Sequence, residues 1–579
     1  MEKRLILAII ISTIILFVYN WVMTTYYYST QPKSLQETYD TSVILTDTIK
    51  VETKITTPII PLSFNLPDSE VLVHKSNDLM DIEFSNKGGK IKQIILKKYK
   101  TKKGENVRLI GSPGEIDNRS AIMLLTEDPS YFGQMSDAYY YREEGDSVIF
   151  EYTTKRIKGG STLPENLLIR KIYLIDKDRY LINTDVEIIN LNDKEVTIKQ
   201  SLLKTDEGVI NGSLFLYLGR GMGQNEVSYI EKSLYNENFV YRIDGKFKRT
   251  DPEKKKGKKI IEVYRGTIET LGLENRYFLI SMFPVPVASG LMIIIDENNE
   301  KEGYLMLPEF QLKQGESFRY SGFIYAGDKR TEELLKVDKS LKPLDGLEPW
   351  ILPVSIARGM VILLRWLYNI IPNYGVAIIL LTILVRIVLY PLTHHSIKSM
   401  KKMQELQPKV QELKQRHADR KDEFNKAIMR LYKESGVNPM GGCLPLILQI
   451  PIFVGLFVAL RNAVELRGAN FCLWITDLSL PDTVYLLPFE IPLLSNFMGR
   501  NINILPILYA ITMHLSSKIG MPPAVTEEQK QQQAMMKFMP LILTVLLWNF
   551  PSGLYLYFTI SNILQIIQQM ITSGQFRKS

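Results

Sequence analysis

The chain has 579 residues, enough for roughly three or four domains of average size, and carries a formal net charge of +8. Hydrophobic residues make up 45% of it and are concentrated towards its two ends, which excludes an ordinary string of soluble domains. The only two cysteines, Cys443 and Cys472, fall at opposite ends of one apolar segment, so we expect no structural disulfide.

The first apolar block runs from Leu5 to Met23 and is long enough to cross a bilayer. It follows Lys3 and Arg4, which favour a cytoplasmic N-terminus. A cleaved signal peptide is the alternative, but two threonines and three tyrosines follow where small residues would mark a cleavage site. We therefore predict an uncleaved transmembrane anchor at 1–23.

Residues 24–60 are rich in Thr, Ser, Gln and Lys, a composition typical of a flexible linker. From 61 to 345 the pattern changes to short alternating runs, such as Tyr180 to Asn190, separated by turn signals such as Gly88-Gly89. This pattern predicts a large antiparallel all-β domain, and its length and turn spacing favour a sandwich.

Beyond residue 345 the chain becomes apolar again. Residues 346–372 carry Arg358 and Arg365 within a hydrophobic pattern and predict an amphipathic helix at the membrane surface. Length and flanking charge then predict five spanning segments within 373–572, followed by a short tail at 573–579. The segments are 373–392, 443–462, 502–518, 536–550 and 552–571.

Charge sets the expected topology. The stretch from Thr393 to Met440 holds 11 Lys and Arg against 6 Asp and Glu, the largest basic excess beside any predicted span. Basic loops stay in the cytoplasm. We therefore expect this stretch and both termini to be cytoplasmic, with residues 24–345 on the outer side.

Arg386 is the most informative single residue, because it stands inside the apolar run 375–392. A membrane-embedded arginine costs about 2.5–3.5 kcal/mol even on a lenient scale, so it needs water or a partner. Thr382 and Tyr390, four residues before and after it, share its helix face. Polar residues recur in three later segments, at Gln449; at Tyr509, Thr512 and Ser516; and at Tyr555, Thr559, Asn562, Gln565 and Gln569, the last set in a stripe that we expect to lie close to one helix face.

These polar residues have two interpretations. Hydroxyl and amide side chains often do no more than bind membrane helices together, at about 0.6 kcal/mol each. However, none of the five segments contains an Asp or Glu that could neutralise Arg386. The pattern therefore favours a hydrated pocket of net positive charge, suited to a transient guest with acidic or polar groups.

Residues 394–436, between the first two of these spans, predict a cytoplasmic helical hairpin. Apolar residues recur every three or four positions from Met403 to Leu413 and from Phe424 to Leu431, which indicates two helices packed on one seam. The hairpin could simply connect two spans. Alternatively, its basic residues form a docking arm for a ribosome, targeting machinery or lipid headgroups. They are Lys401, Lys402, Lys409, Lys414, Arg416, Arg420 and Lys421.

The chain resembles the YidC-type membrane protein insertases of Gram-negative bacteria. The matching stretches are NYGVAIILLTILVRIVLYPLT at 373–393, KMQELQPKVQELK at 402–414, NPMGGCLPLILQIPIF at 438–453, LWITDLS at 473–479 and FPSGLYLYFTISN at 550–562. They occur in the family's order and cover nearly all of 345–572. The external domain resembles the family more loosely, through FSNKGGKIKQIIL at 84–96.

This resemblance implies an α-helical membrane protein of the inner membrane: an N-terminal anchor, a five-helix core with a groove open to cytoplasm and lipid, and a periplasmic β-sandwich related to sugar-binding domains. Arg386, Thr382 and Gln449 match groove-lining positions, and Trp474 and Tyr557 match positions of substrate contact. The family inserts newly made membrane proteins, alone or with the Sec translocon.

The chain departs from the family pattern in two places. Residues 484–501 are an apparent insertion before the fourth of the six predicted spans, counting the anchor as the first, and the tail lacks the long basic extension of some members. We expect no enzyme activity and no cofactor, and the chain has no Gly-rich phosphate loop for a nucleotide. A secondary transporter or a sugar-acting β domain are the alternatives. Paired broken helices are not evident, and only His74 of five histidines lies in the β domain.

Overall fold

The computed structural model describes residues 69–573 with gaps, the longest of which are at 111–121, 126–137, 155–164, 219–237, 251–259, 437–443 and 490–497. The predicted anchor at 1–23 and linker at 24–60 lie outside the described residues, as does nearly all of the tail at 573–579.

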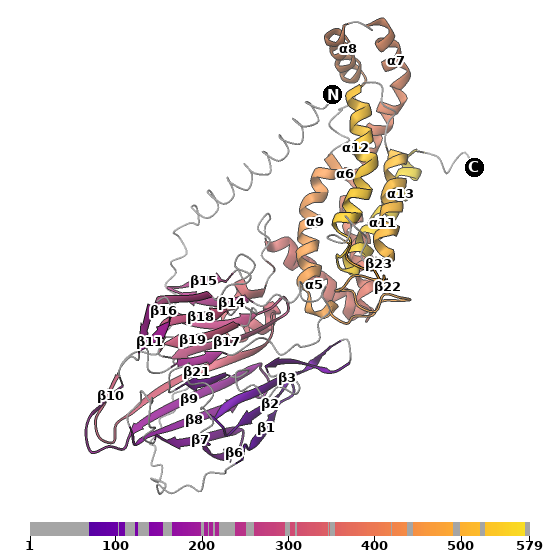
Figure 1. The fold of residues 1–579 in the computed structure, drawn as a ribbon. Helices are drawn as coiled ribbons and strands as arrows, with labels where there is room; N and C mark the ends of the chain where they lie inside the picture. Colours follow the sequence, from indigo (N-terminus) through magenta and orange to yellow (C-terminus); the bar gives the residue numbers. More distant parts are fainter. Residues whose placement is uncertain are drawn as a thin grey trace. The chain divides into compact units, whose positions relative to one another are not determined.

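The predicted β domain is confirmed as an antiparallel structure (Figure 1). Its strands are β1 Leu72–Ser76, β2 Met80–Ser85, β3 Lys90–Lys100, β4 Asn106–Ile110, β5 Ile122–Leu125, β6 Tyr140–Glu144, β7 Ser147–Thr153, β8 Leu167–Ile175, β9 Leu181–Asn190, β10 Val196–Ile198, β11 Leu202–Thr205, β12 Gly208–Asn211, β13 Phe215–Leu218, β14 Asn238–Ile243, β15 Lys246–Arg249, β16 Ile260–Glu274, β17 Phe278–Val285, β18 Ala288–Ile295, β19 Lys301–Met306, β20 Phe310–Leu312 and β21 Ser317–Asp328.

Strand pairing is continuous through one long strand, β16. On one side the order is β6–β7–β8–β9–β21–β17–β16. On the other it is β16–β18–β19–β13–β5–β3–β2–β1. The register of β16 shifts between Arg265 and Ile268, around Gly266 with φ +145°. Such a bulge bends a strand, which allows β16 to serve both groups of strands.

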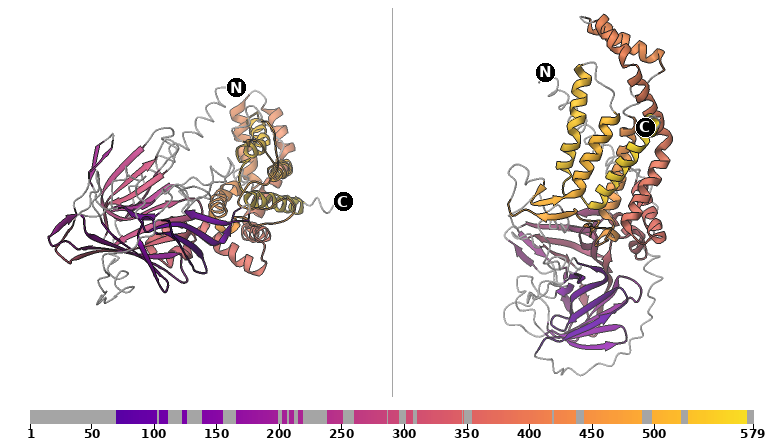
Figure 2. Two further views of the ribbon diagram at one scale, coloured as in Figure 1. Left: turned by 60° about the horizontal axis from the view of Figure 1, so that its bottom comes forward. Right: turned by 90° about the vertical axis from the view of Figure 1, so that its right-hand side faces the viewer.

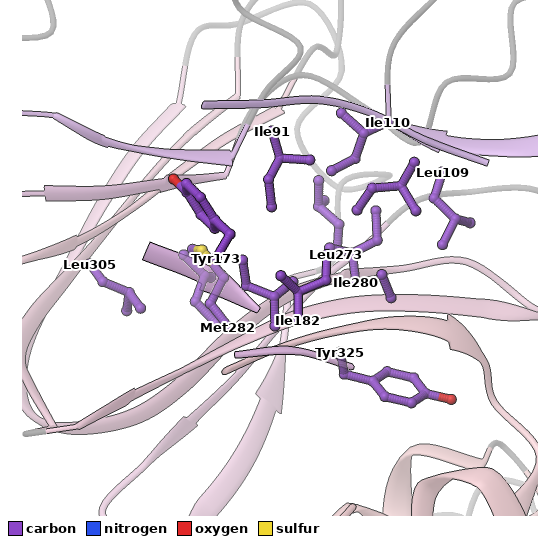
Figure 3. Packing of buried hydrophobic residues seen from close by; sticks show 14 of the residues in the cluster. Ile91, Leu109, Ile110, Tyr173, Ile182, Leu273, Ile280, Met282, Leu305 and Tyr325 are labelled. Carbon is purple, nitrogen blue, oxygen red and sulfur yellow. The ribbon is translucent and has the colours of Figure 1, made fainter. Parts of the chain in front are cut away.

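The core of the β domain lies between these strands. Figure 3 shows Ile91 and Ile110, from β3 and β4, facing Ile182 and Ile280, from β9 and β17. All four are almost fully buried. Two faces of alternating apolar residues have thus closed on one another, as a sandwich requires. The turn signal at Gly88-Gly89 is also confirmed, since both glycines adopt positive φ between β2 and β3.

The second half of the chain is helical. Its helices are α4 Thr331–Leu335, α5 Val354–Ile370, α6 Tyr374–Glu405, α7 Gln407–Arg416, α8 Lys421–Glu434, α9 Leu444–Asn462, α11 Ile504–Gly520, α12 Glu527–Leu546 and α13 Ser552–Ser573, with a two-stranded hairpin of β22 Thr483–Leu486 and β23 Asn501–Asn503. Among the described residues, Tyr374–Pro391 within α6 is long and apolar enough to cross a membrane. Shorter apolar runs occupy Pro451–Asn462 and Ile504–Ile519.

Two helix boundaries differ from the sequence-based prediction. α6 does not end near residue 392 but continues through Pro391 to Glu405, so the first part of the predicted hairpin 394–436 belongs to α6. α12 begins at Glu527 rather than 536, because the polar run EEQKQQQ has good helix formers and extends the apolar helix. Hydrophobicity marked the apolar stretch, whereas helix propensity and capping set the ends.

The predicted packing of the hairpin is confirmed. Val410 of α7 is buried with Phe424, Ile428 and Tyr432 of α8. Met403, Leu406, Leu413 and Leu431 pack against them. Tyr432 extends the seam by one residue beyond the predicted apolar positions.

We call α6, α9, α11, α12 and α13 the helical bundle. α13 packs against α6 and α11, α12 packs against α11, and α5 flanks the bundle against α6 and α9. The same helices run side by side in Figures 1 and 2. Their shared core includes Leu381, Leu456, Leu460, Tyr509 and Phe558. Residues far apart in sequence are thus brought to the two long faces of α13.

Candidate functional site

Arg386 joins α6 to α13. Its Nε and Nη2 atoms donate to Ser561 Oγ at 3.0 and 2.7 Å, and Nη2 also donates to Gln565 Oε1 at 3.1 Å. Ser561 and Gln565 are four residues apart, so one face of α13 supplies both acceptors. These acceptors are neutral, and no Asp or Glu of the described chain forms an ion pair with Arg386. Among the described residues, therefore, no carboxylate neutralises the half-buried guanidinium.

The predicted polar face of α6 runs from the core to the surface. Thr382 is fully buried and donates to the carbonyl oxygen of Ile378, one turn earlier, at 2.7 Å. Tyr390 is 48% exposed and stacks on His394. Arg386 lies between these extremes. Side-chain exposure therefore increases along this face from Thr382 through Arg386 to Tyr390. Neighbouring helices cover Thr382.

The polar residues of α13 divide between two faces, which corrects the prediction of a single stripe. Asn562 Nδ2 approaches Thr512 Oγ1 of α11 at 3.4 Å, and Tyr555 packs edge-on against Tyr509. Gln565, predicted to share that face, instead contacts Arg386. Ser516 of α11 is buried. One face of α13 thus serves α11 and the other serves α6.

Sequence reasoning missed Ser561 and the pair formed by Thr393 and Gln568. Thr393 Oγ1 accepts a hydrogen bond from Gln568 Nε2 at 3.0 Å, one turn beyond the Arg386 contacts. The i, i+4 spacing of Ser561 and Gln565 does indicate that they share one face of the helix, but this is not the face that carries Asn562.

Buried polar atoms remain on the α11 side of α13. Tyr555 Oη, Thr559 Oγ1 and Gln569 Oε1 are buried without a hydrogen-bond partner among the described residues. An unsatisfied buried polar group typically costs about 1–3 kcal/mol. Their grouping on one helix favours a site that polar groups can enter over a purely apolar helix interface.

Three other predicted site residues have different settings. Gln449 lies on α9, but its side chain is outside the described residues. Tyr557 is 1% exposed and belongs to the bundle core. Trp474 donates from Nε1 to Asp482 Oδ2 at 3.0 Å. Substrate contact by Tyr557 and Trp474 stays a prediction.

A connected polar cap closes one end of the bundle, and sequence reasoning missed its central residue, Asp482. Besides Trp474, Asp482 Oδ2 accepts from the backbone N–H groups of Ile504 and Leu505 at 3.0 and 2.7 Å. These N–H groups open α11, where a carboxylate is favoured. Burial raises the pKa of Asp482, and the hydrogen bonds lower it only in part.

The same cap holds the ends of other helices. Asn373 at the start of α6 donates to Phe471 O at 3.2 Å, and Ser552 at the start of α13 donates from its backbone to Leu480 O at 2.7 Å. Asn503 Nδ2 donates to Trp548 O, just after α12, at 2.8 Å. The first residues of α6, α11 and α13 thus meet the end of α12, as alternating helix directions require.

The basic residues of the hairpin point outward in part. Lys402, Lys409, Lys414, Arg416 and Arg420 are exposed and Lys401 is half-buried, while the side chain of Lys421 is outside the described residues. Arg416 and Arg420 form exposed pairs with Glu412 and Glu423 at 2.6 and 3.0 Å. Exposed pairs contribute little stability, so these groups stay available to an anionic partner.

Known families match almost the whole chain. Residues 366–579 match the family described as "60Kd inner membrane protein", and residues 73–361 match the family described as "YidC periplasmic domain". A relative from Citrifermentans bemidjiense, named membrane protein insertase YidC, is 31% identical over 98% of each chain. One of the same name from Syntrophus aciditrophicus is 29% identical over 99% of this chain and 100% of its own.

Two solved structures are similar to the chain at low sequence identity and low TM-score. A structure titled "Active YidC insertase crystal structure with the first transmembrane domain resolved" covers 87% of this chain and 93% of its own, at 19% identity and a TM-score of 0.34. A putative aldose 1-epimerase from Escherichia coli K12 covers 45% of this chain at 10% identity and a TM-score of 0.31. From the full-length relatives and the two matched families, the chain belongs to the YidC family of membrane protein insertases.

Proposed function

We propose that this insertase receives the polar flank of a new membrane protein in a groove lined by α6, α9, α11 and α13, with Arg386 as the anchoring charge. The observation that supports this most is the set of acceptors around Arg386. Ser561 and Gln565 solvate the guanidinium without neutralising it. A net positive charge within an apolar bundle attracts acidic groups and needs a hydrated or exchangeable site.

The neighbours of Arg386 favour a sideways exit into lipid. Ile387 and Val388, the next two residues of α6, are among the most exposed apolar residues of the bundle. A client segment of about 20 apolar residues that leaves past them buries enough area to draw a short polar flank across. A membrane potential adds about 2.3 kcal/mol per 100 mV for each acidic charge moving outward.

The wider arrangement belongs to the same proposal. An anchor at 1–23 and five spans would place both termini and the α7–α8 hairpin in the cytoplasm and the β domain in the periplasm of a Gram-negative cell. The exposed bases of α7 and α8 suit a ribosome, targeting machinery or anionic lipid headgroups. The family resemblance supports cooperation with the Sec translocon for some clients.

Insertion assays with Arg386→Gln test the charge directly. In proteoliposomes, the amount of protease-protected product should fall at least about tenfold for clients with acidic flanks, because one charge-assisted contact contributes roughly 1.5–3 kcal/mol. Clients with neutral flanks should change little, and Arg386→Lys should restore part of the loss. Arg461→Gln removes an exposed arginine of α9 and is the matched control. An equal fall for both client types would contradict the electrostatic role.

Photo-crosslinking locates the client. A photoreactive residue at Gln565, beside Arg386, should form adducts with a stalled single-span client, and these should disappear when the client is released. Ile567 on the same helix is exposed and serves as the lipid-side control. Thr382 is a poor probe because its side chain is fully buried. If no adducts formed at Gln565 while insertion proceeded, the client would lie elsewhere. Adducts that formed equally at Gln565 and Ile567 and persisted after release would also contradict a client site beside Arg386.

A further inference from the structure

The hairpin of β22 and β23 has a rigid polar base. Thr483 pairs with Asn503 and Leu486 with Asn501 across the two strands. Trp548 Nε1 donates to Asn501 O at 2.9 Å, and Thr483 Oγ1 bonds to Asn503 Oδ1 at 2.8 Å. This base is part of the cap that includes Asp482. The position of the hairpin is therefore fixed by the bundle rather than by its own strands.

The arm beyond that base, residues 484–489, is apolar and is left exposed by the rest of the described chain. Tyr485 is 58% exposed, Leu486 61% and Phe489 61%. The segment 483–489 (TVYLLPF) contains no charged residue. Loops that face only water are normally polar, and contiguous exposed apolar side chains mark an interaction surface. The first part of the apparent insertion, residues 484–489, is thus an exposed apolar arm on a base that the bundle holds in position.

The exposure of consecutive residues shows what kind of partner fits. The pairing is irregular at Val484 and regular again at Tyr485 and Leu486. Neighbouring side chains of a regularly paired strand point to opposite faces, so exposed Tyr485 and Leu486 show that the described residues leave both faces of the ribbon uncovered. A docked protein covers one face, whereas a lipid layer surrounds both. Aromatic and aliphatic side chains are the ones that settle at the boundary between headgroups and acyl chains.

The hairpin is also continuous with a helix that presents an apolar outer face. β23 ends at Asn503 and α11 begins at the next residue. Ile507, Ile511 and Leu515 form an exposed stripe along α11. If α11 spans the membrane, as proposed above, its first turn places the arm at the membrane surface. Exposed Arg500, whose Nε donates to Leu487 O, is then level with the phosphates.

We propose that the arm 484–489 is an interfacial lipid anchor, immersed in the outer leaflet beside the start of α11. The occupant is phospholipid: acyl chains and glycerol around Tyr485, Leu486 and Phe489, and headgroup phosphate at Arg500. This inference rests on the proposed placement of α11 as a spanning helix.

Fluorescence quenching tests the anchor in the full-length protein. Cys443 and Cys472 are replaced by serine, and an environment-sensitive fluorophore is attached to Leu486→Cys or, separately, to Phe489→Cys. The protein is placed in vesicles of phosphatidylethanolamine and phosphatidylglycerol with or without lipids that carry a nitroxide near the headgroup. We expect strong nitroxide quenching at both positions and at least a threefold lower iodide quenching constant than at an exposed site in water.

Two control positions separate this inference from the proposal on which it rests. Ile511→Cys labels the outer face of α11, and Val287→Cys labels an exposed apolar residue of the β domain. Nitroxide quenching at Ile511 but not at Leu486, with iodide reaching Leu486 as it reaches Val287, overturns the anchor alone. Protection of Leu486 from both quenchers means that protein covers it, which also overturns the anchor. Failure of nitroxide quenching at Ile511 overturns the placement of α11 instead.

Discussion

Arg170 and Lys329 of the β domain lie in ion pairs, whereas Arg386 and Asp482 of the helical bundle and its cap contact neutral groups. In the β domain, Arg170 lies between Glu151 and Glu187 at 2.6 and 2.8 Å, and Lys329 lies 2.9 Å from Glu274. In the bundle, Arg386 meets a hydroxyl and an amide, and Asp482 meets an indole and two backbone N–H groups. Ion pairs neutralise charge within the fold, whereas neutral dipoles hold it in place and leave it available.

The flanking helix α5 behaves like the β domain. Its Arg358 pairs with Asp345 at 2.8 Å, and its Arg365 pairs with Glu465 at 2.7 Å. Both arginines were expected to mark the polar side of a helix on the membrane surface. Their pairing shows that they bind protein carboxylates, while Ile362, Trp366 and Ile370 form the exposed side of the helix. Counter-ions thus accompany the arginines that have a structural role.

Breaking the triad of the β domain should have the largest effect. Arg170→Met leaves the buried carboxylate of Glu151 without its cation, and removal of one partner from a buried pair costs about 3–5 kcal/mol. We expect a large fall in the unfolding midpoint of the full-length protein in detergent, followed by the β-sheet signal in circular dichroism. Lys177→Met breaks an exposed pair with Asp146 and should change stability by less than about 0.5 kcal/mol. Equal effects would remove the basis of the comparison.

Lys171 gives the β domain a pH dependence. It is fully buried and donates to Gly88 O at 2.5 Å. Burial, with a smaller contribution from Lys90, lowers the pKa of Lys171 to about 7. Because the unfolded chain binds this proton up to a pH of about 10.4, the stability of the folded state should rise from pH 7 towards 10 by up to 1.4 kcal/mol per unit.

Lys171→Met should abolish that rise. Unfolding free energies are measured at pH 7, 8 and 9. Over this range the unfolding free energy of the unmodified protein should rise by about 2–3 kcal/mol relative to that of the variant. Parallel pH profiles for the two proteins would mean that Lys171 stays protonated in the folded state.

Asp482→Ala should destabilise the cap of the bundle by about 2 kcal/mol, since it removes a cap of α11 and the partner of the Trp474 indole. Hydrogen exchange at the first turn of α11 and the emission of Trp474 are the measurements. Asp482→Asn retains an acceptor oxygen and should lose less than half as much. If the two variants were alike, the charge rather than its hydrogen bonds would matter.

Among the substitutions of buried charged residues, Arg386→Met should have the smallest effect on stability, about 1 kcal/mol, because Ser561 and Gln565 carry no charge that would be left unpaired. The detergent unfolding midpoint provides the test, with Arg170→Met as the reference. A loss as large as that of Arg170→Met would make Arg386 a structural residue and would remove the contrast between the two regions.

The alternation of polar and apolar residues was sufficient to predict the β domain and the hairpin seam. β9 occupies Leu181–Asn190, almost the run from which it was predicted, and Val410 meets Phe424 and Ile428 as expected. Such periodicity reflects burial of one face, which the sequence records directly. Hydropathy also identified the centre of every helix in the bundle, although it misplaced the start of α12 and the end of α6.

The site was predictable in its charge but not in its partners. Arg386 stood out because its burial conflicts with its chemistry. Which face of α13 meets it depends on the rotation of two helices that are 175 residues apart in sequence, so Ser561 escaped notice. Asp482 was missed for the same reason. Its role depends on the loop that carries it returning to the start of α11, and no local pattern encodes that return.

The continuity of α6 has a mechanical consequence. Arg386 and Glu405 belong to one α-helix, so about 28 Å of continuous helix connects the charge to the base of the α7–α8 hairpin. Pro391 lies between them, and its ring removes one backbone hydrogen bond and softens the rod at that point. A partner that docks on the α7–α8 hairpin and displaces it would tilt α6 about Pro391 and so move Arg386, with no loop between them to absorb the motion.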